Sequence, residues 1–141
     1  MSFVKIYIHA VWSTKDRYPF LNSSIRSDIL NHIRDYANSK GIHIDHINGS
    51  TEHLHTLLSM GADQNIATIM NLLKGESSHW INKQDLVHGK FSWQDEYFAV
   101  SIGEAQVDVI RKYIRDQEAH HKKKTFQQEY EEFMKNYGFD K

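Results

Sequence analysis

The amino-acid sequence contains no cysteine, no long apolar run and no surplus of basic charge. The lack of cysteine excludes disulfides and thiolate metal sites, and it is typical of proteins in a reducing cytoplasm. No run approaches the roughly 18 consecutive apolar residues that a membrane-spanning helix needs. The start of the chain carries Lys5 and His9 and has no small-residue cleavage site, so it does not resemble a secretory signal. We therefore expect a cytoplasmic protein that does not associate with membranes.

The formal net charge of −1 hides an uneven distribution of charge along the chain. Residues 111–124 contain six Lys or Arg and two acidic residues, whereas residues 125–141 contain four acidic residues and two lysines. An acidic tail therefore masks a basic segment, and that segment is either a solvated helix face or a phosphate-binding surface. The ten histidines are the one unusual count, because histidine is the commonest metal ligand among the side chains.

The spacing of apolar residues predicts the order βαββαβ followed by two C-terminal helices. Strands are expected at residues 3–13, 42–48, 53–60 and 93–102, with a turn at Asn48-Gly49. Helices are expected from an N-cap at Asn22 or Ser23 up to Gly41, and at residues 65–83, 104–121 and 125–137.

This order is that of the ferredoxin-like, or RRM-like, α+β fold, in which two helices cover one face of a four-stranded antiparallel sheet. The length of 141 residues fits one hydrophobic core. We therefore expect residues 1–141 to form a single domain, with its core in residues 3–124 and a helical tail in residues 125–141.

A His-Leu-His motif lies on the third expected strand. Side chains alternate between the faces of a strand, so His53 and His55 share one face about 7 Å apart along the backbone, and Leu54 points into the core. Two such imidazoles suit a divalent cation, but a metal site needs at least one further ligand. The alternative is a solvent-facing pair on a half-exposed strand.

Tyr113 and Gln117 lie four residues apart on the helix expected at residues 104–121. They share a helix face beside the buried side that Ile110 and Ile114 mark. A phenol with a pKa near 10 is a poor nucleophile at neutral pH, but a metal ion that polarises a phosphate oxygen compensates for this. Tyr113 is thus a candidate nucleophile and Gln117 a candidate third ligand. The alternative is an ordinary buried tyrosine.

Residues suited to nucleic acid are spread over the chain, since single strands bind to cationic grooves with stacking aromatic rings. The candidates for DNA contact are Trp12, Lys15, Arg17, Lys74, Lys122, Lys123 and Lys124. His120 and His121 follow Gln117 and could contact phosphate or the outer shell of a metal, but a favourable interaction with the helix dipole is the preferred explanation, and they are not assigned as ligands.

Four stretches together resemble the IS200/IS605-type single-tyrosine transposases of the HUH endonuclease superfamily and their relatives associated with repetitive extragenic palindromes. The stretches are HAVWSTKDR (9–17), EHLHTLL (52–58), LLKGESSHWIN (72–82) and YFAVSIGEAQVDVIRKYIRDQEAHH (97–121). They run in the family order and cover most of residues 3–124. The combination of HLH with a downstream YIxxQxxHH is specific, whereas no single stretch is.

The resemblance implies roles for four residues: His53 and His55 as metal ligands, Gln117 as the third ligand and Tyr113 as the catalytic tyrosine. The metal would be Mg²⁺ or Mn²⁺. Tyr113 would attack a phosphate of single-stranded DNA, leaving a 5′-phosphotyrosine and a free 3′-OH, and strand exchange would follow by reversal. The resemblance further implies recognition of DNA hairpins at element ends and a homodimer, in some members with the tyrosine helix of one subunit completing the site of the other.

The sequence departs from this family at two places. Glu52 stands where relatives commonly carry Asp, and the tail beyond Lys124 is long. The tail leaves open whether the protein belongs to a mobile element or is a domesticated relative that no longer transposes. Two other functions stay open: a non-catalytic RRM-like module that binds single-stranded nucleic acid, and a small metal-dependent sensor or hydrolase. Neither has a use for the histidine pair, Tyr113 and Gln117 together.

Overall fold

The computed structural model describes residues 2–117, 119 and 123–139. Four strands form one antiparallel sheet in the order β2-β3-β1-β4. The strands are β1 (Ile6–Ser13), β2 (His43–Gly49), β3 (His53–Met60) and β4 (Phe98–Ile102). The helices are α1 (Ser23–Ser39), α2 (Ile66–Lys83), α3 (Val107–Arg115) and α5 (Phe126–Asn136), with short 3-10 turns η1 (Lys15–Arg17) and η2 (Glu104–Gln106).

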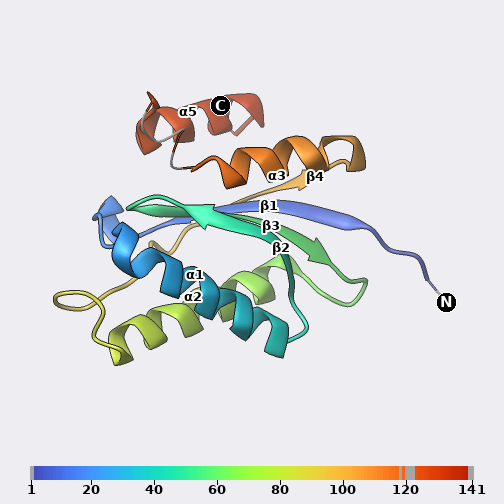
Figure 1. Ribbon diagram of the computed structural model, residues 1–141. Coiled ribbons are helices and arrows are strands. Elements are labelled where there is room, and N and C mark those ends of the chain that lie inside the picture. The colour runs from blue at the N-terminus through green and yellow to red at the C-terminus, as the bar shows by residue number, and fades with distance from the viewer. Residues whose placement is uncertain (1, 118, 120–122, 140–141) are drawn as a thin grey trace.

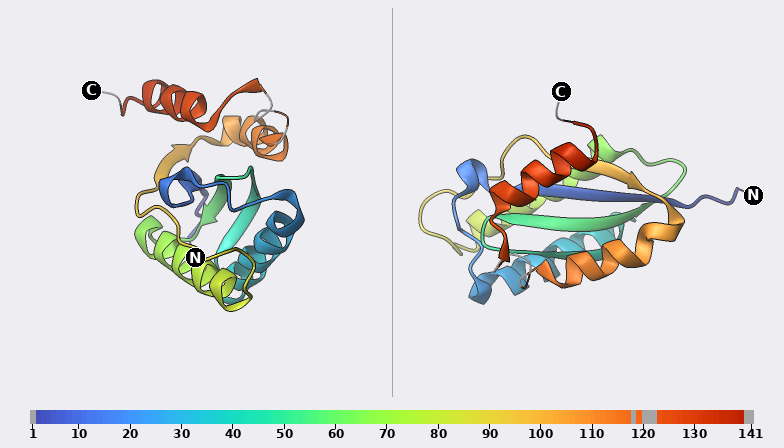
Figure 2. Two further views of the ribbon diagram at one scale, coloured as in Figure 1. Left: turned by 90° about the vertical axis from the view of Figure 1, so that its left-hand side faces the viewer. Right: turned by 90° about the horizontal axis from the view of Figure 1, so that it is seen from above.

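The sheet separates two layers of helices (Figure 1). Helices α1 and α2 cover one face, whereas α3 and α5 lie over the other, with α5 crossing above the strands (Figure 2). The predicted ferredoxin-like arrangement is therefore confirmed. Among the described residues, no helix has both the length and the apolar character needed to cross a bilayer.

The main core lies between the sheet and helices α1 and α2. Leu54 and Leu58 of β3 are fully buried there, against Ile29 and Ile33 of α1. Helix α1 begins where predicted, because the side chain of Asn22 accepts hydrogen bonds from the backbone of the first turn. Side chains alternate along β1 and β3, so those on one face of the sheet pack in this core and those on the other face lie toward α3 and α5.

The turn between β2 and β3 lies later than predicted. Strand β2 continues through Gly49, and the chain reverses at residues 50–52, where Ser50 N–H donates to His53 O at 3.0 Å. A Cβ on Gly49 would lie 2.2 Å from His53 O. Glycine is therefore needed for close approach of the two strands and does not form the turn itself.

Two other predicted elements are less regular in the structure than expected. The strand expected at residues 93–102 is regular only from Phe98, because Lys74 takes the carbonyl oxygens of Gln94 and Asp95 at 2.6 and 2.7 Å. The helix expected at residues 104–121 begins as a 3-10 turn and is interrupted after Arg115, at the C-cap Asp116, whereas the described residues 117 and 119 are again helical.

A charged contact joins α3 to the edge strand β2. The strand register shifts between Ile44 and His46, and Asp45 in this bulge accepts two hydrogen bonds from Arg111 at 2.9 and 2.7 Å. The Arg111 guanidinium lowers the pKa of the Asp45 carboxyl from 3.8 to about 2. This pair holds α3 over the sheet, on the side where the site residues lie.

We expect Asp45→Asn to lower the midpoint of thermal unfolding by roughly 2–5 °C at neutral pH, because it removes one partner of this pair. A carboxyl whose pKa is lower in the folded chain stabilises the fold above its unfolded pKa and loses that contribution as the pH falls. The difference between wild type and variant should therefore shrink between about pH 4 and about pH 2 in calorimetric scans.

Asp108→Asn is the matched control, since Asp108 is an exposed partner of the same arginine. We expect it to change the midpoint by less than about 1 °C. A loss in Asp45→Asn that is the same at every pH would contradict this role of the carboxylate charge.

Candidate metal and tyrosine site

Two imidazoles emerge from β3 on the face opposite the main core. His53 and His55 are both 0% exposed, and their ring centroids lie 5.0 Å apart. Leu54 between them belongs to the main core, as the alternation predicts. The alternative of a solvent-facing pair is wrong, because helix α5 covers both rings.

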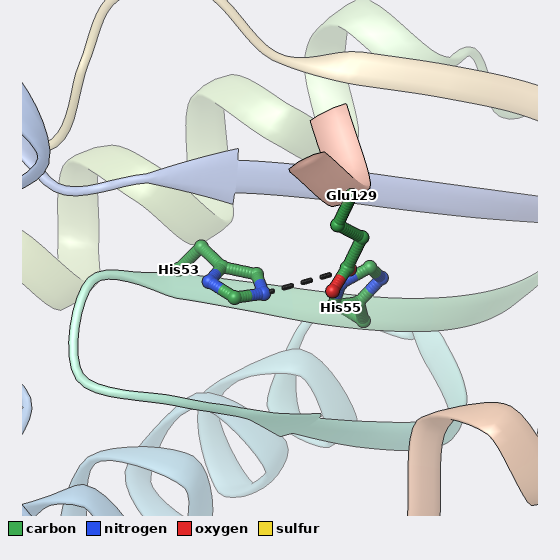
Figure 3. Close-up of side chains that lie close together, drawn as sticks. All are labelled: His53, His55 and Glu129. Atoms are coloured by element: carbon green, nitrogen blue, oxygen red, sulfur yellow. Dashed lines mark ion pairs between the residues drawn. The ribbon is translucent and has the colours of Figure 1, made fainter. Parts of the chain in front are cut away.

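Glu129 of α5 completes a cluster with the two histidines (Figure 3). Its Oε1 lies 2.5 Å from His55 Nε2 and 3.6 Å from His53 Nε2. One ligand atom from each of the three residues lies within 4.8 Å of the others, and all three residues are buried. Two imidazole nitrogens and one carboxylate oxygen form a donor set that suits a divalent transition metal or Zn²⁺.

Glu129 is not among the site residues predicted from the sequence. A usable signal exists, because Glu129 shares the apolar face of α5 with Phe126, Tyr130 and Phe133 at helical spacing. A single carboxylate on an otherwise apolar face indicates a partner beneath the helix. Which partner it meets depends on how α5 folds back over the sheet.

The charges in the cluster are mutually stabilising. Burial alone would lower the pKa of His53, but hydrogen bonds to Glu129 and Glu52 outweigh it and raise the pKa. Burial alone would raise the pKa of Glu129, but hydrogen bonds from the two histidines hold this pKa well below its usual range. Glu129 is therefore a charged carboxylate in a buried place, which is tolerated only because it is paired.

Each histidine also has an outer partner. His53 Nδ1 lies 2.8 Å from Ser50 Oγ and 3.1 Å from Glu52 Oε1, which leaves Nε2 for the cluster. His55 Nδ1 lies 2.9 Å from Nε2 of His9. Partners of this kind set the orientation of metal-binding imidazoles. Glu52, the departure noted in the sequence, thus still reaches the first histidine.

His9 is a second residue of the site that is not among those predicted from the sequence. It lies on β1 and is 1% exposed, and burial together with the neighbouring His55 lowers its pKa to about 3. Its ring stacks on that of His55 with centroids 5.1 Å apart. His9 begins the first of the four stretches quoted above, but only strand pairing shows which histidine it contacts.

Tyr113 of α3 reaches the same cluster. Its ring meets that of His55 edge-on with centroids 5.5 Å apart, and it also packs against Phe133. Burial and the charge of Glu129 raise the pKa of Tyr113 above its ordinary value of 10. In this arrangement the phenol keeps its proton. The structure thus brings Tyr113 and the histidine pair together within one chain.

Gln117 lies just beyond the C-cap of α3 at Asp116. It is fully buried, and its Nε2 donates to Tyr113 O at 3.4 Å. Its Oε1 is buried and has no hydrogen-bond partner among the residues that the structure describes. A buried oxygen of this kind can accept a ligand bond, so its role as third ligand stays a prediction.

The predicted DNA contacts differ in their surroundings. Trp12 is 1% exposed in the main core, which speaks against a role as a stacking platform. Lys74 is engaged by the loop carbonyls described above. Arg17 lies over the rings of Phe126 and Tyr130 at 5.0 and 5.2 Å, and it donates to Gln127.

The remaining lysines are at the surface or outside the described residues. Lys15 and Lys123 are exposed, and Lys124 forms an exposed ion pair with Glu132. Lys122 and the histidines at 120 and 121 lie outside the described residues.

Helix α5 is the cover of the site. Phe126 stacks on His53 with centroids 4.0 Å apart, and Phe133 lies 5.7 Å from the ring of His55. Together with Glu129 these rings exclude solvent from both imidazoles. Beside α5 lies a cleft of about 780 Å³ that is lined by aromatic side chains of α5 and by Tyr97 and Phe98.

The fold and the cluster define a class of protein. It is a ferredoxin-like protein whose histidine pair and tyrosine lie at one face of the sheet. Unlike the open face of an RRM module, this face is covered by helices. Residues 2–117 match the family described as "Transposase IS200 like", and the chain belongs to this family of single-tyrosine transposases. The resemblance found in the sequence is thereby confirmed.

Known relatives agree with this family. The chain is 25% identical over 114 residues to the ISDra2 transposase TnpA of Deinococcus radiodurans, an alignment that covers 77% of this chain and 81% of the relative. The crystal structure of a protein from Deinococcus radiodurans R1 described as a transposase has a TM-score of 0.64 at 24% identity, over 82% of this chain and 93% of that one. The structure of a REP-associated tyrosine transposase bound to a REP hairpin has a TM-score of 0.66 at 14% identity, over 86% and 72%. These two structures show the same fold.

We expect calorimetric titration with Mn²⁺ to detect binding that His53→Ala weakens by roughly tenfold or more, because it removes a nitrogen donor. Glu129→Gln and Gln117→Ala separate the two candidates for the third ligand: the variant that weakens binding identifies it. His43→Ala and Glu131→Gln alter exposed residues and serve as controls. Unchanged affinity in His53→Ala would exclude the histidine pair as the site.

Proposed function

We propose that this protein is a metal-dependent single-stranded DNA endonuclease and strand transferase that acts through a 5′-phosphotyrosine intermediate at hairpin-marked DNA ends. The observation that carries the proposal is the meeting of Tyr113 with the cluster of His53, His55 and Glu129 in one chain. A tyrosine supplies a nucleophilic oxygen, and the neighbouring donor atoms suit a divalent metal ion. These are the groups needed to transfer a phosphodiester to a phenol. Membership of the transposase family supports the same reaction.

Mg²⁺ or Mn²⁺ would be held by His53 and His55, with Gln117 or Glu129 as the third ligand. Such an ion polarises the phosphate and stabilises the negative charge that develops on it. The buried, mutually adjacent donors fit such an ion, as does the oxygen of Gln117, which has no hydrogen-bond partner within the described part of the chain. The outer partners Ser50 and Glu52 orient the first imidazole.

In the proposed reaction the oxygen of Tyr113 bonds to phosphorus while the bond from phosphorus to the 3′ oxygen breaks. The phenol gives its proton to solvent, and the 3′ oxygen takes one up. The downstream strand stays attached through its 5′ phosphate. Attack by a second 3′-OH reverses these bonds, joins a new strand and releases Tyr113, so the incoming 3′-OH has to reach the phosphotyrosine.

DNA can reach this site only when α5 moves away, because both imidazoles are fully buried beneath it. The contacts that have to open are those of Glu129 with the histidines and of Phe126 with His53. Glu129 would therefore hold the ion only while α5 is closed, and Gln117 would be the third ligand once DNA enters. Opening of these contacts also removes the negative charge and the burial that raise the pKa of Tyr113. Displacement of α5 therefore makes the phenol easier to ionise at the moment when a phosphate can enter.

Single-stranded DNA with hairpins is the proposed substrate. A relative of the same fold is bound to a REP hairpin, and the aromatic cleft beside α5 offers rings on which unpaired bases can stack. Because Tyr113 meets the histidine pair of its own chain, we propose a site assembled in cis, within a homodimer of this single catalytic domain.

The RRM-like binding module is the less favoured function. RRM modules stack bases on the open face of the sheet. In this protein α3 and α5 cover that face, and the buried histidine cluster lies beneath them (Figure 1).

The proposal predicts that a labelled single-stranded hairpin forms a covalent adduct with the protein in the presence of Mn²⁺, and that Tyr113→Phe abolishes it. The phenylalanine keeps the ring packing but has no nucleophilic oxygen. Adducts are detected as bands of reduced mobility in denaturing gels.

Tyr36→Phe is the control, because Tyr36 lies on α1, on the far face of the sheet. We expect it to form adducts as wild type does. Normal adduct formation by Tyr113→Phe would exclude Tyr113 as the nucleophile, and cleavage without any adduct would favour a metal-dependent hydrolase.

A further inference from the structure

His9 is a buried imidazole with one polar contact in the described part of the chain. Its Nε2 lies 2.9 Å from Nδ1 of His55. Its Nδ1 is buried and has no hydrogen-bond partner among the described residues. A buried polar ring with one free nitrogen is less favourable than an apolar ring of the same size. The contact with His55 is therefore what distinguishes histidine from phenylalanine at this position.

Strand pairing places this contact. His9 of β1 lies opposite Leu57 of β3, on the same face as His55. The two imidazoles stack with an interplanar angle of 29°, which brings the edge nitrogen of one to that of the other. Both residues belong to regular strands, so the distance is set by the sheet and not by a loop.

From this geometry we propose that His9 is a positioning residue: its hydrogen bond to Nδ1 of His55 fixes the His55 ring so that Nε2 points into the cluster with His53 and Glu129. The proposal rests on the proposed function, because it concerns the same site. It assigns His55 an outer partner of its own, just as Ser50 and Glu52 serve His53.

An imidazole suits this task because its Nε2 can either donate or accept a hydrogen bond. When His55 Nε2 faces the Glu129 carboxylate, as in this structure, Nδ1 of His55 either accepts from His9 or donates to it, according to the tautomer. Were Nε2 of His55 to hold a metal ion, Nδ1 would carry the proton and donate to His9. The same bond therefore persists whether α5 is closed or open.

A purely structural role for His9 is the competing explanation. Its ring also packs edge-on against Phe133 and Tyr113, with centroids 5.5 and 6.2 Å away. A side chain that only fills this space should be replaceable by phenylalanine. A side chain that orients His55 should not be, but glutamine, whose amide can donate or accept, should substitute for it.

The test compares His9→Phe and His9→Gln in the full-length chain, with Mn²⁺ alone as the probe in calorimetric titration. We expect His9→Phe to bind Mn²⁺ roughly 10–100-fold more weakly, and His9→Gln to stay within about threefold of wild type. Urea unfolding of each variant without metal shows whether the fold is retained.

Wild-type affinity in a folded His9→Phe would overturn the proposal, and so would affinity in His9→Gln as weak as in His9→Phe. An absence of Mn²⁺ binding by the wild-type protein would overturn it as well. The titration contains no DNA, so it is separate from strand cleavage. If Mn²⁺ binding depends on His9 but no adduct forms with any hairpin, the positioning role stands and the proposed function fails.

Discussion

The alternation of side chains along β3 is the constraint on which this structure depends. Leu54 enters the main core, whereas His53 and His55 point to the opposite layer. A shift of register by one residue would bury a histidine in the apolar core and turn the leucine toward α5. The tight approach at Gly49 and the pairing of β3 with β1 and β2 on both sides fix this register.

The cover helix α5 adds a second constraint, which is electrostatic. It carries one carboxylate, Glu129, into a layer otherwise made of aromatic rings, and two imidazoles compensate its charge. A buried charge that lost these partners would be strongly destabilising, so Glu129 and the histidine pair are mutually dependent. The same contacts keep the site closed and keep the pKa of Tyr113 high. Closure of the site and the raised pKa of Tyr113 are thus two effects of one ion cluster.

Much of the fold could be predicted because it follows from local patterns. The period-two alternation of β1 and β3, the N-cap at Asn22 and the spacing of Ile29 and Ile33 all act within a few residues of sequence. The errors lie where distant groups compete with local preference. Lys74 takes the carbonyls that would have extended β4, and Gly49 serves strand approach and not the turn.

The sequence by itself determined the strand motif, the shared face of His53 and His55, and the family to which the chain belongs. These follow from short-range periodicity and from residues that stand in fixed order along the chain. Only the tertiary structure decided that Glu129 meets the histidine pair, that His9 contacts His55 and that α5 closes the site. His9 lies 46 positions from His55 in the sequence, and Glu129 lies 74 positions from His55. Periodicity contains no information about which faces meet when helices fold back across a sheet.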